Sequence, residues 1–183
     1  MGLYGDKLTL GSGTAVDSLA KSAGTSQDNL LHYNSLLTNG DFEGVDVDGL
    51  GAGWTSTAGI PSIQTGSING RSQRITAGES STINLYQDII ILPNPEMTYM
   101  SLSFKLKTNS SGTLRVWEEI THKEIYKIDL SEVSGTLEVE VQFKATDITR
   151  LYFEATNMLE NNYFEVDDVV FKALNQDNLT YTI

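Results

Sequence analysis

The chain has 183 residues, 39% of them hydrophobic, which is the length and apolar content of one folded domain. It has no cysteine, so disulfides, thiolate metal ligands and cysteine nucleophiles are excluded. The 24 acidic residues against 12 basic ones give a net charge of -12, which repels phosphate backbones and anionic lipid. We therefore expect neither nucleic acid nor a membrane as a partner.

Residues 1–35 are rich in Gly, Ser, Thr and Ala and show no apolar alternation of strand length. This composition predicts a short, weakly structured N-terminal arm, which is either a flexible terminus or a segment that orders on a partner chain. The opening residues lack the basic start and apolar core of a secretory signal, so we expect no export by a signal peptide. Residues 175–183 form a shorter tail of the same kind.

Residues 36–174 contain many short segments in which apolar and polar residues alternate. Met100–Leu106 and Leu137–Phe143 are the clearest examples, and this period of two is typical of half-buried antiparallel strands. The Gly-rich stretch Gly40–Gly78 is expected to form long irregular loops. Together these patterns predict an all-β protein, a β-sandwich or barrel. The other predicted strands are Ser81–Leu92, Thr113–Glu119, Glu124–Leu130, Arg150–Ala155 and Tyr163–Lys172.

Acidic residues stand at both ends of this body, with Asp41 and Glu43 near its start and Asp167 and Asp168 in its last strand. Two adjacent Asp residues in an otherwise apolar strand are costly to bury without compensation. A Ca²⁺ ion, which prefers oxygen ligands in loose geometry, would supply that compensation. The alternative is that one Asp faces solvent and the other accepts hydrogen bonds from a loop.

Trp117 and Arg115 lie on the strand face opposite Leu114 and Val116. A tryptophan on the polar face of a sheet can stack on the C–H face of a sugar, so these two residues are candidates for carbohydrate binding. The tyrosines that are candidates for the same role are Tyr86, Tyr126 and Tyr152. The alternative for each is ordinary packing, and Trp54 is expected to lie in the core.

The chain shows no sequence motif of a catalytic site. Gly-x-Ser-x-Gly, His-Glu-x-x-His and a phosphate-binding loop are all absent, and the two histidines stand far apart at His32 and His122. We expect no enzymatic activity. A glycosidase-type pair of carboxylates is the one enzymatic alternative that the composition leaves open.

Five segments of the body, in order and spacing, resemble carbohydrate-binding modules of the family 4/9/22 type, which adopt a galactose-binding-domain-like jelly roll. The resemblance spans residues 36–174 and implies an antiparallel β-sandwich of jelly-roll type. In that family a structural Ca²⁺ commonly joins the opening segment to the closing Asp, so Glu43 and Asp168 would be its first ligands here, followed by Asp41 and Asp167. The five segments are Leu36–Gly44, Gly53–Trp54, Leu85–Ile89, Tyr99–Phe104 and Tyr163–Val169.

A second resemblance concerns the whole chain. A polar arm with Asp28-Asn29-Leu30-Leu31, leading to Asn39-Gly40-Asp41-Phe42-Glu43 and a jelly roll, looks like bacteriophage virion accessory proteins of the neck, tail or capsid fibre. This implies a protein made in the host cytoplasm and located in the virion. Its residues 1–35 would bind other virion proteins within a homo-oligomer, and its jelly roll would face outward toward cell-surface glycans. The alternative is an extracellular carbohydrate-binding module detached from, or belonging to, a glycoside hydrolase.

Overall fold

The computed structural model describes residues 35–89, 98–118, 122–145 and 149–174. The chain divides into two units, Met1–Ser35 and Leu36–Ile183, and every element below belongs to the second. The predicted tail, and the arm up to residue 34, lie outside the described residues. Within the described ranges, no helix has the length and apolar character needed to span a bilayer.

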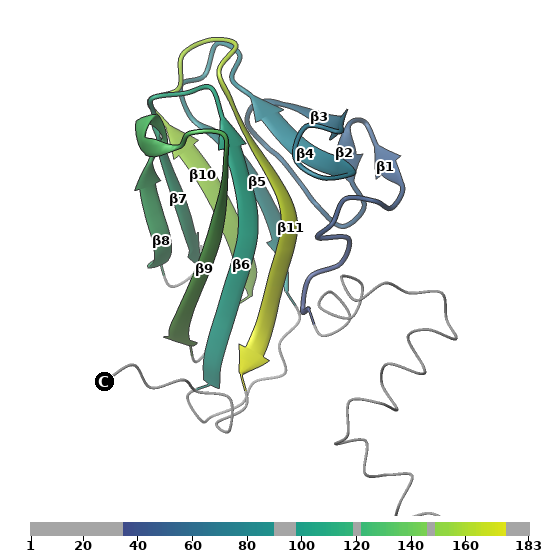
Figure 1. The fold of residues 1–183 in the computed structure, drawn as a ribbon, viewed down its shortest axis with the longest axis vertical. Coiled ribbons are helices and arrows are strands. Elements are labelled where there is room, and N and C mark those ends of the chain that lie inside the picture. The colour runs from purple at the N-terminus through teal and green to yellow at the C-terminus, as the bar shows by residue number, and fades with distance from the viewer. Residues whose placement is uncertain (1–34, 90–97, 119–121, 146–148, 175–183) are drawn as a thin grey trace, which may run out of the picture. The chain divides into compact units, whose positions relative to one another are not determined.

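Two antiparallel sheets face each other and form a β-sandwich (Figure 1). The five-stranded sheet has the order β3 (Ile60–Thr65), β4 (Arg71–Thr76), β11 (Tyr163–Leu174), β6 (Thr98–Thr108) and β9 (Thr136–Ala145). The four-stranded sheet has the order β5 (Ile83–Asp88), β10 (Arg150–Thr156), β7 (Thr113–Glu118) and β8 (Lys123–Asp129). A hairpin of β1 (Asp46–Val47) and β2 (Leu50–Gly51) lies beside β3 and β4, and a short 3₁₀ helix, η1 (Leu130–Glu132), follows β8. The predicted all-β jelly-roll sandwich is confirmed.

The core lies between the sheets and is built from alternate residues of both. Phe153 of β10 is fully buried and meets Phe104 of β6 edge-on, with ring centroids 5.3 Å apart. Trp54 is buried as expected, and its ring lies 6.2 Å from that of Phe153. Because successive side chains of a strand point to opposite faces, burial of Leu85, Val116 and Phe153 directs their neighbours outward. This alternation positions the residues of the candidate site.

The prediction of irregular loops over Gly40–Gly78 is wrong, because this stretch contains β1, β2, β3 and β4. The residues of β3 and β4 give no apolar alternation, and β4 buries Ser72 and Gln73 completely. Gln73 is satisfied because its amide accepts from the Gly51 N–H at 2.9 Å and donates to the Gly49 carbonyl at 2.9 Å. Buried polar residues with such partners form strands that apolar periodicity cannot reveal.

The opening segment of the body runs alongside β11. The Leu36 N–H donates to the Phe171 carbonyl at 2.6 Å, and the Val169 N–H donates to the Gly40 carbonyl at 2.8 Å. The pairing of β11 with β6 shifts register in a β-bulge between Asp167 and Val170, where Asp168 has a φ of 49°. Val169, which contacts Gly40, lies within this bulge. The first and last parts of the body are therefore joined at this bulge.

Replacing Gly40 by Ala should destabilise the fold, because a Cβ at Gly40 would lie 2.0 Å from the Val169 carbonyl oxygen, which is backbone and cannot turn away. We expect the free energy of unfolding to fall by about 2–4 kcal/mol, measured by urea denaturation. Gly78→Ala is the control, since its added Cβ would meet only the Ile60 Cδ1 at 3.9 Å. Equal stability of the two variants would contradict this account of the joint.

Candidate functional site

Three aromatic residues form a row across the outer face of the four-stranded sheet. Tyr86 of β5 lies directly opposite Tyr152 of β10, and Tyr152 lies directly opposite Trp117 of β7. Each projects away from the core because its sequence neighbour is buried. We call Tyr86, Tyr152 and Trp117 the aromatic row.

The rings of the row are in contact from end to end. Tyr86 and Tyr152 stack with centroids 5.4 Å apart and planes at 13°, and Tyr152 meets Trp117 edge-on at 5.6 Å. His122, at the turn before β8, extends the row by stacking on Trp117 at 5.2 Å. Aromatic contacts of this kind fix the rings in place. The result is an ordered series of rings that crosses three strands.

An arginine–carboxylate pair flanks each end of the aromatic row. The Arg150 guanidinium lies 4.3 Å from the ring centroid of Tyr86, and its Nε is 2.6 Å from the Asp88 carboxylate. The Arg115 guanidinium lies 4.0 Å from the centroid of Trp117 and binds Glu154 at 3.1 Å. These flanking pairs place hydrogen-bond donors and acceptors beside apolar rings, and each positive charge is balanced by a negative one.

The row is partly covered by its own neighbours. Tyr86 is half-buried, whereas Trp117 and Tyr152 are each only 9% exposed. Because Arg115 and His122 both lie against the indole, a ligand ring can stack on Trp117 only after one of these side chains moves. The indole Nε1 is buried and has no hydrogen-bond partner within the described residues. An unpaired buried N–H costs free energy, so an acceptor on a ligand would stabilise it.

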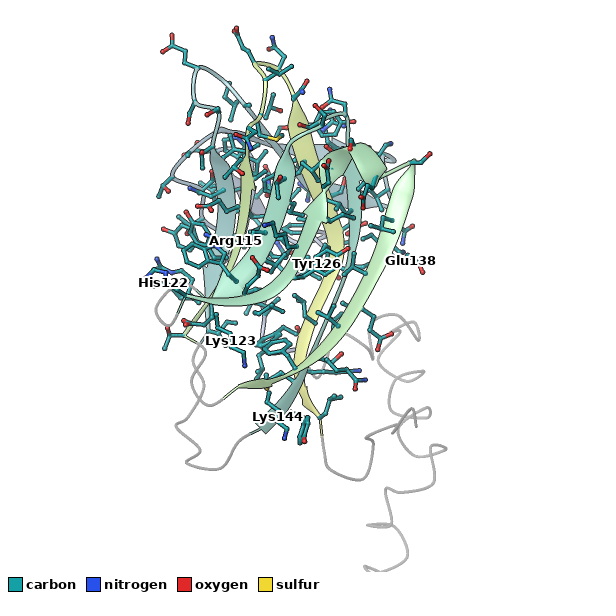
Figure 2. All side chains as sticks on the ribbon, turned by 90° about the vertical axis from the view of Figure 1, so that its left-hand side faces the viewer. Arg115, His122, Lys123, Tyr126, Glu138 and Lys144 are labelled. Carbon is teal, nitrogen blue, oxygen red and sulfur yellow. The ribbon has the colours of Figure 1, made fainter. Side chains whose placement is uncertain are left out.

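The structure brings four of the five predicted sugar-binding residues together and does not bring the fifth. Trp117, Arg115, Tyr86 and Tyr152 share the outer face, but Tyr126 of β8 points between the sheets and meets the core residue Phe104 edge-on at 5.9 Å. Burial, with a smaller contribution from the charge of Glu132, raises the pKa of the Tyr126 hydroxyl. Figure 2 shows Arg115 and His122 close together, with Tyr126 between them and β9.

Sequence reasoning did not identify four residues of this face. They are both acids of the flanking pairs, the arginine that lies over Tyr86, and the histidine that stacks on the indole. A signal was present in β10, where Arg150, Tyr152 and Glu154 alternate with three buried apolar residues. That alternation marks one outward face with both charge and an aromatic ring. The missed residues are Asp88, Arg150, Glu154 and His122.

The four acids predicted to bind Ca²⁺ are not assembled into one site. Glu43 Oε1 accepts a hydrogen bond from the Arg71 N–H at 2.6 Å, and Asp41 Oδ1 accepts from the Glu43 N–H at 3.4 Å. Asp167 Oδ1 accepts from the Asp168 N–H at 2.7 Å, and Asp168 binds the Lys105 ammonium. Among the described residues, no three His, Asp or Glu side chains could hold one metal ion. In the described structure these side chains therefore form no joint carboxylate cluster: Asp168 binds an ammonium, and Asp167 Oδ2 is buried without a hydrogen-bond partner.

Asp167 nevertheless has an unusual environment, being only 1% exposed. Burial, and then the charge of Asp168, raise the pKa of the Asp167 carboxyl to about 7, against the N–H groups of Asp168 and Asn69 and the charge of Lys105. An unfolded Asp has a pKa of about 3.9, so the folded state binds the extra proton between these values. The contribution of Asp167 to stability therefore falls as the pH rises from about 4 to about 7.

Asp167→Asn tests this linkage, because the amide has no proton to lose. We expect wild-type protein to lose stability between pH 5 and pH 8 in urea denaturation, and the variant to lose measurably less. The difference between the two proteins removes the contribution of all other titrating groups. An identical pH dependence in both would show that the Asp167 carboxyl is ionised throughout this range.

Comparison with known proteins gives a fold but no family. No protein-family model matches the chain, and no curated protein matches it in sequence. Among solved structures it is similar to the carbohydrate-binding module TmCBM61, solved with β-1,4-galactotriose, over 76% of this chain and 99% of that one, with 13% identity and a TM-score of 0.54. It is also similar to the N-terminal cellulose-binding domain of Cellulomonas fimi β-1,4-glucanase C, over 70% and 93%, with 12% identity and a TM-score of 0.51.

A third similar structure is the enzymatically active domain of tailspike protein 4 from bacteriophage CBA120, with 17% identity and a TM-score of 0.50. The match covers 78% of this chain and only 22% of the tailspike chain. At these identities the likeness shows the jelly-roll fold alone. The fold is shared by carbohydrate-binding modules, which occur both separately and within larger proteins.

Proposed function

We propose that this protein is a non-catalytic glycan-binding module that uses the outer face of its four-stranded sheet. The single observation that carries the proposal is the aromatic row with an arginine–carboxylate pair at each end. Aromatic surfaces pack against the C–H faces of sugars, while guanidinium and carboxylate groups hydrogen-bond their hydroxyls. The described structure thus offers both kinds of contact on one face.

The proposal of binding without catalysis rests on the same face. The carboxylates of the two flanking pairs, Asp88 and Glu154, each bind an arginine. That arrangement suits the orientation of hydroxyl groups, whereas glycoside hydrolysis needs an acid that protonates a leaving group and a second carboxylate placed across the bond. The similar modules named above support binding, because one was solved with a galactotriose and the other is a cellulose-binding domain.

We further propose that the module belongs to a bacteriophage particle, where residues 1–35 would attach it to other virion proteins as a homo-oligomer. The likeness to part of a phage tailspike supports this setting. The alternative, a module of a glycoside hydrolase, predicts a chain that stays monomeric. Light scattering on the full chain and on a chain beginning at Leu36 distinguishes them, since only an attachment arm would make the longer chain self-associate.

Tyr86→Ala tests glycan binding with little risk to the fold, because Tyr86 is half-buried on the sheet surface. Binding is found first by screening wild-type protein against a panel of oligosaccharides, and is then titrated by calorimetry. Removal of a stacking ring should weaken the best ligand by about 10-fold. The loss is expected because the row would lose its end ring and the partner of Arg150.

Tyr163→Ala is the matched control. Tyr163 is also half-buried and lies under a guanidinium, that of Arg74 at 3.8 Å, but belongs to the other sheet. Its loss should leave glycan affinity unchanged. Equal effects of the two substitutions would place the site elsewhere on the molecule, and no binding to any glycan on the panel would remove the support for a sugar-binding function.

A further inference from the structure

Two adjacent carboxylates, Asp167 and Asp168, stand on the β-bulge of β11, and Lys105 of β6 faces them. We propose that Lys105 is a built-in counter-cation that fills the place of a metal ion at this joint, so that the body folds independently of Ca²⁺. This inference goes beyond glycan binding and does not depend on it. It concerns how the first and last segments of the body are held together.

The position of Lys105 is set by strand register. Lys105 lies directly opposite Asp167 across the β6–β11 pairing, and the bulge begins immediately after that residue. The bulge turns Asp168 with a φ of 49°, and its Oδ2 lies 2.6 Å from the Lys105 Nζ. Both side chains are only 27–28% exposed, so solvent screens their attraction less than it would at the surface. The ammonium is thus held at the carboxylate pair by the backbone of two central strands.

The electrostatics of the cluster agree with this role. The hydrogen bond and charge of Asp168, followed by the charges of Asp167 and Glu138, raise the pKa of the Lys105 ammonium against the opposing effect of burial. Glu138 belongs to β9 and lies opposite Lys105 on the other side of β6. The lysine therefore stays charged between carboxylates on both neighbouring strands.

Of the remaining candidate oxygens, Asp167 Oδ1 and Glu43 Oε1 accept hydrogen bonds from amide donors, whereas Asp167 Oδ2 is buried without a hydrogen-bond partner in the described structure. Asp167 accepts hydrogen bonds from the N–H groups of Asp168 and Asn69, and Glu43 accepts one from the N–H of Arg71. Asn69 and Arg71 lie at the end of the β3–β4 turn. Their backbone N–H groups donate to Asp167 and to Glu43, respectively. A metal ion would have to displace these donors as well as the ammonium.

The mechanical consequence lies at the bulge. Val169, next to Asp168, donates its N–H to the Gly40 carbonyl, which ties the opening segment to β11. The ion pair between Lys105 and Asp168 holds the bulge of β11 against β6, and the positive charge comes from a side chain of the protein itself. The joint between the two ends of the body then needs no ion from solution.

The test compares full-length wild-type protein in CaCl₂ and in EDTA by thermal unfolding, with calorimetric titration of CaCl₂. We expect no heat of binding and a change in Tm below about 1 °C. Lys105→Met should lower Tm by about 5 °C in EDTA, because it leaves two carboxylates without their cation. Added CaCl₂ should then restore part of that loss, because the vacated position accepts a cation.

Lys107→Met is the matched control on the same face of the same strand. The Lys107 ammonium donates to the carbonyl and hydroxyl oxygens of Ser67 and pairs with no carboxylate in the described structure. A rise in Tm of wild-type protein with CaCl₂ would overturn the proposal. So would a Lys105→Met protein that is no less stable than Lys107→Met, or one that remains insensitive to Ca²⁺. If Lys105→Met does not fold, the wild-type titration still decides, with Lys105→Arg as a charge-preserving variant.

Discussion

Trp117→Ala should reduce glycan affinity by about 50-fold, the largest loss we expect from any single residue of the aromatic row. Trp117 is the largest ring of the row, and it contacts Tyr152, His122 and Arg115. Its removal would therefore take away the stacking surface and also release the guanidinium of one flanking pair. Calorimetric titration with the best oligosaccharide of the screen measures the loss.

Because Trp117 is only 9% exposed, its truncation also costs stability, and the variant must be shown to be folded by circular dichroism. Trp117→Phe is the second variant, since it keeps an aromatic surface but lacks the indole N–H. We expect it to retain more affinity than Trp117→Ala and less than wild type. A folded Trp117→Ala protein with wild-type affinity would exclude the aromatic row as the binding site.

The alternation of side chains along a strand predicted that Trp117 lies on the outer face, because Leu114 and Val116 on the same strand are apolar. Alternation within β8 is ambiguous for Tyr126, because the apolar residues Ile125 and Ile128 stand three positions apart and point to opposite assignments. In the structure Tyr126 lies directly opposite the buried Val116 and so faces the core. The register shift falls beyond that pair and lets Ile125 pack against the core as well, which local composition does not reveal.

The aromatic row itself depends on a pairing between distant strands. Tyr86 and Tyr152 stand 66 positions apart in the sequence, and only the β5–β10 register places them opposite each other. The same holds for Lys105, whose position opposite Asp167 follows from the β6–β11 register. The sequence showed which residue types could bind sugar or a cation. It could not show which of them meet, because cross-strand register is a property of the folded sheet.

Arg74→Met should be the most destabilising of the substitutions considered, with a loss of about 3–5 kcal/mol. The Glu165 side chain is 0% exposed and accepts two hydrogen bonds from Arg74, at 2.9 Å from Nε and 2.7 Å from Nη2. Its other oxygen accepts from the Ser72 hydroxyl at 2.6 Å. Without the guanidinium, a buried carboxylate keeps only one neutral donor, and its desolvation is no longer offset. Guanidinium denaturation, followed by tryptophan fluorescence, measures the change.

Arg71→Met on the same strand is the control, because Arg71 pairs with Asp46 where both side chains are more than a quarter exposed. An exposed pair of this kind contributes about 1 kcal/mol or less. The double variant Arg74→Met with Glu165→Met should be more stable than Arg74→Met alone, since it leaves no buried charge. That ordering separates the two physical causes, because loss of packing alone would make the double variant the less stable one. If Arg74→Met and Arg71→Met lost equal stability, the Glu165 carboxylate would have to be reached by water in the folded protein.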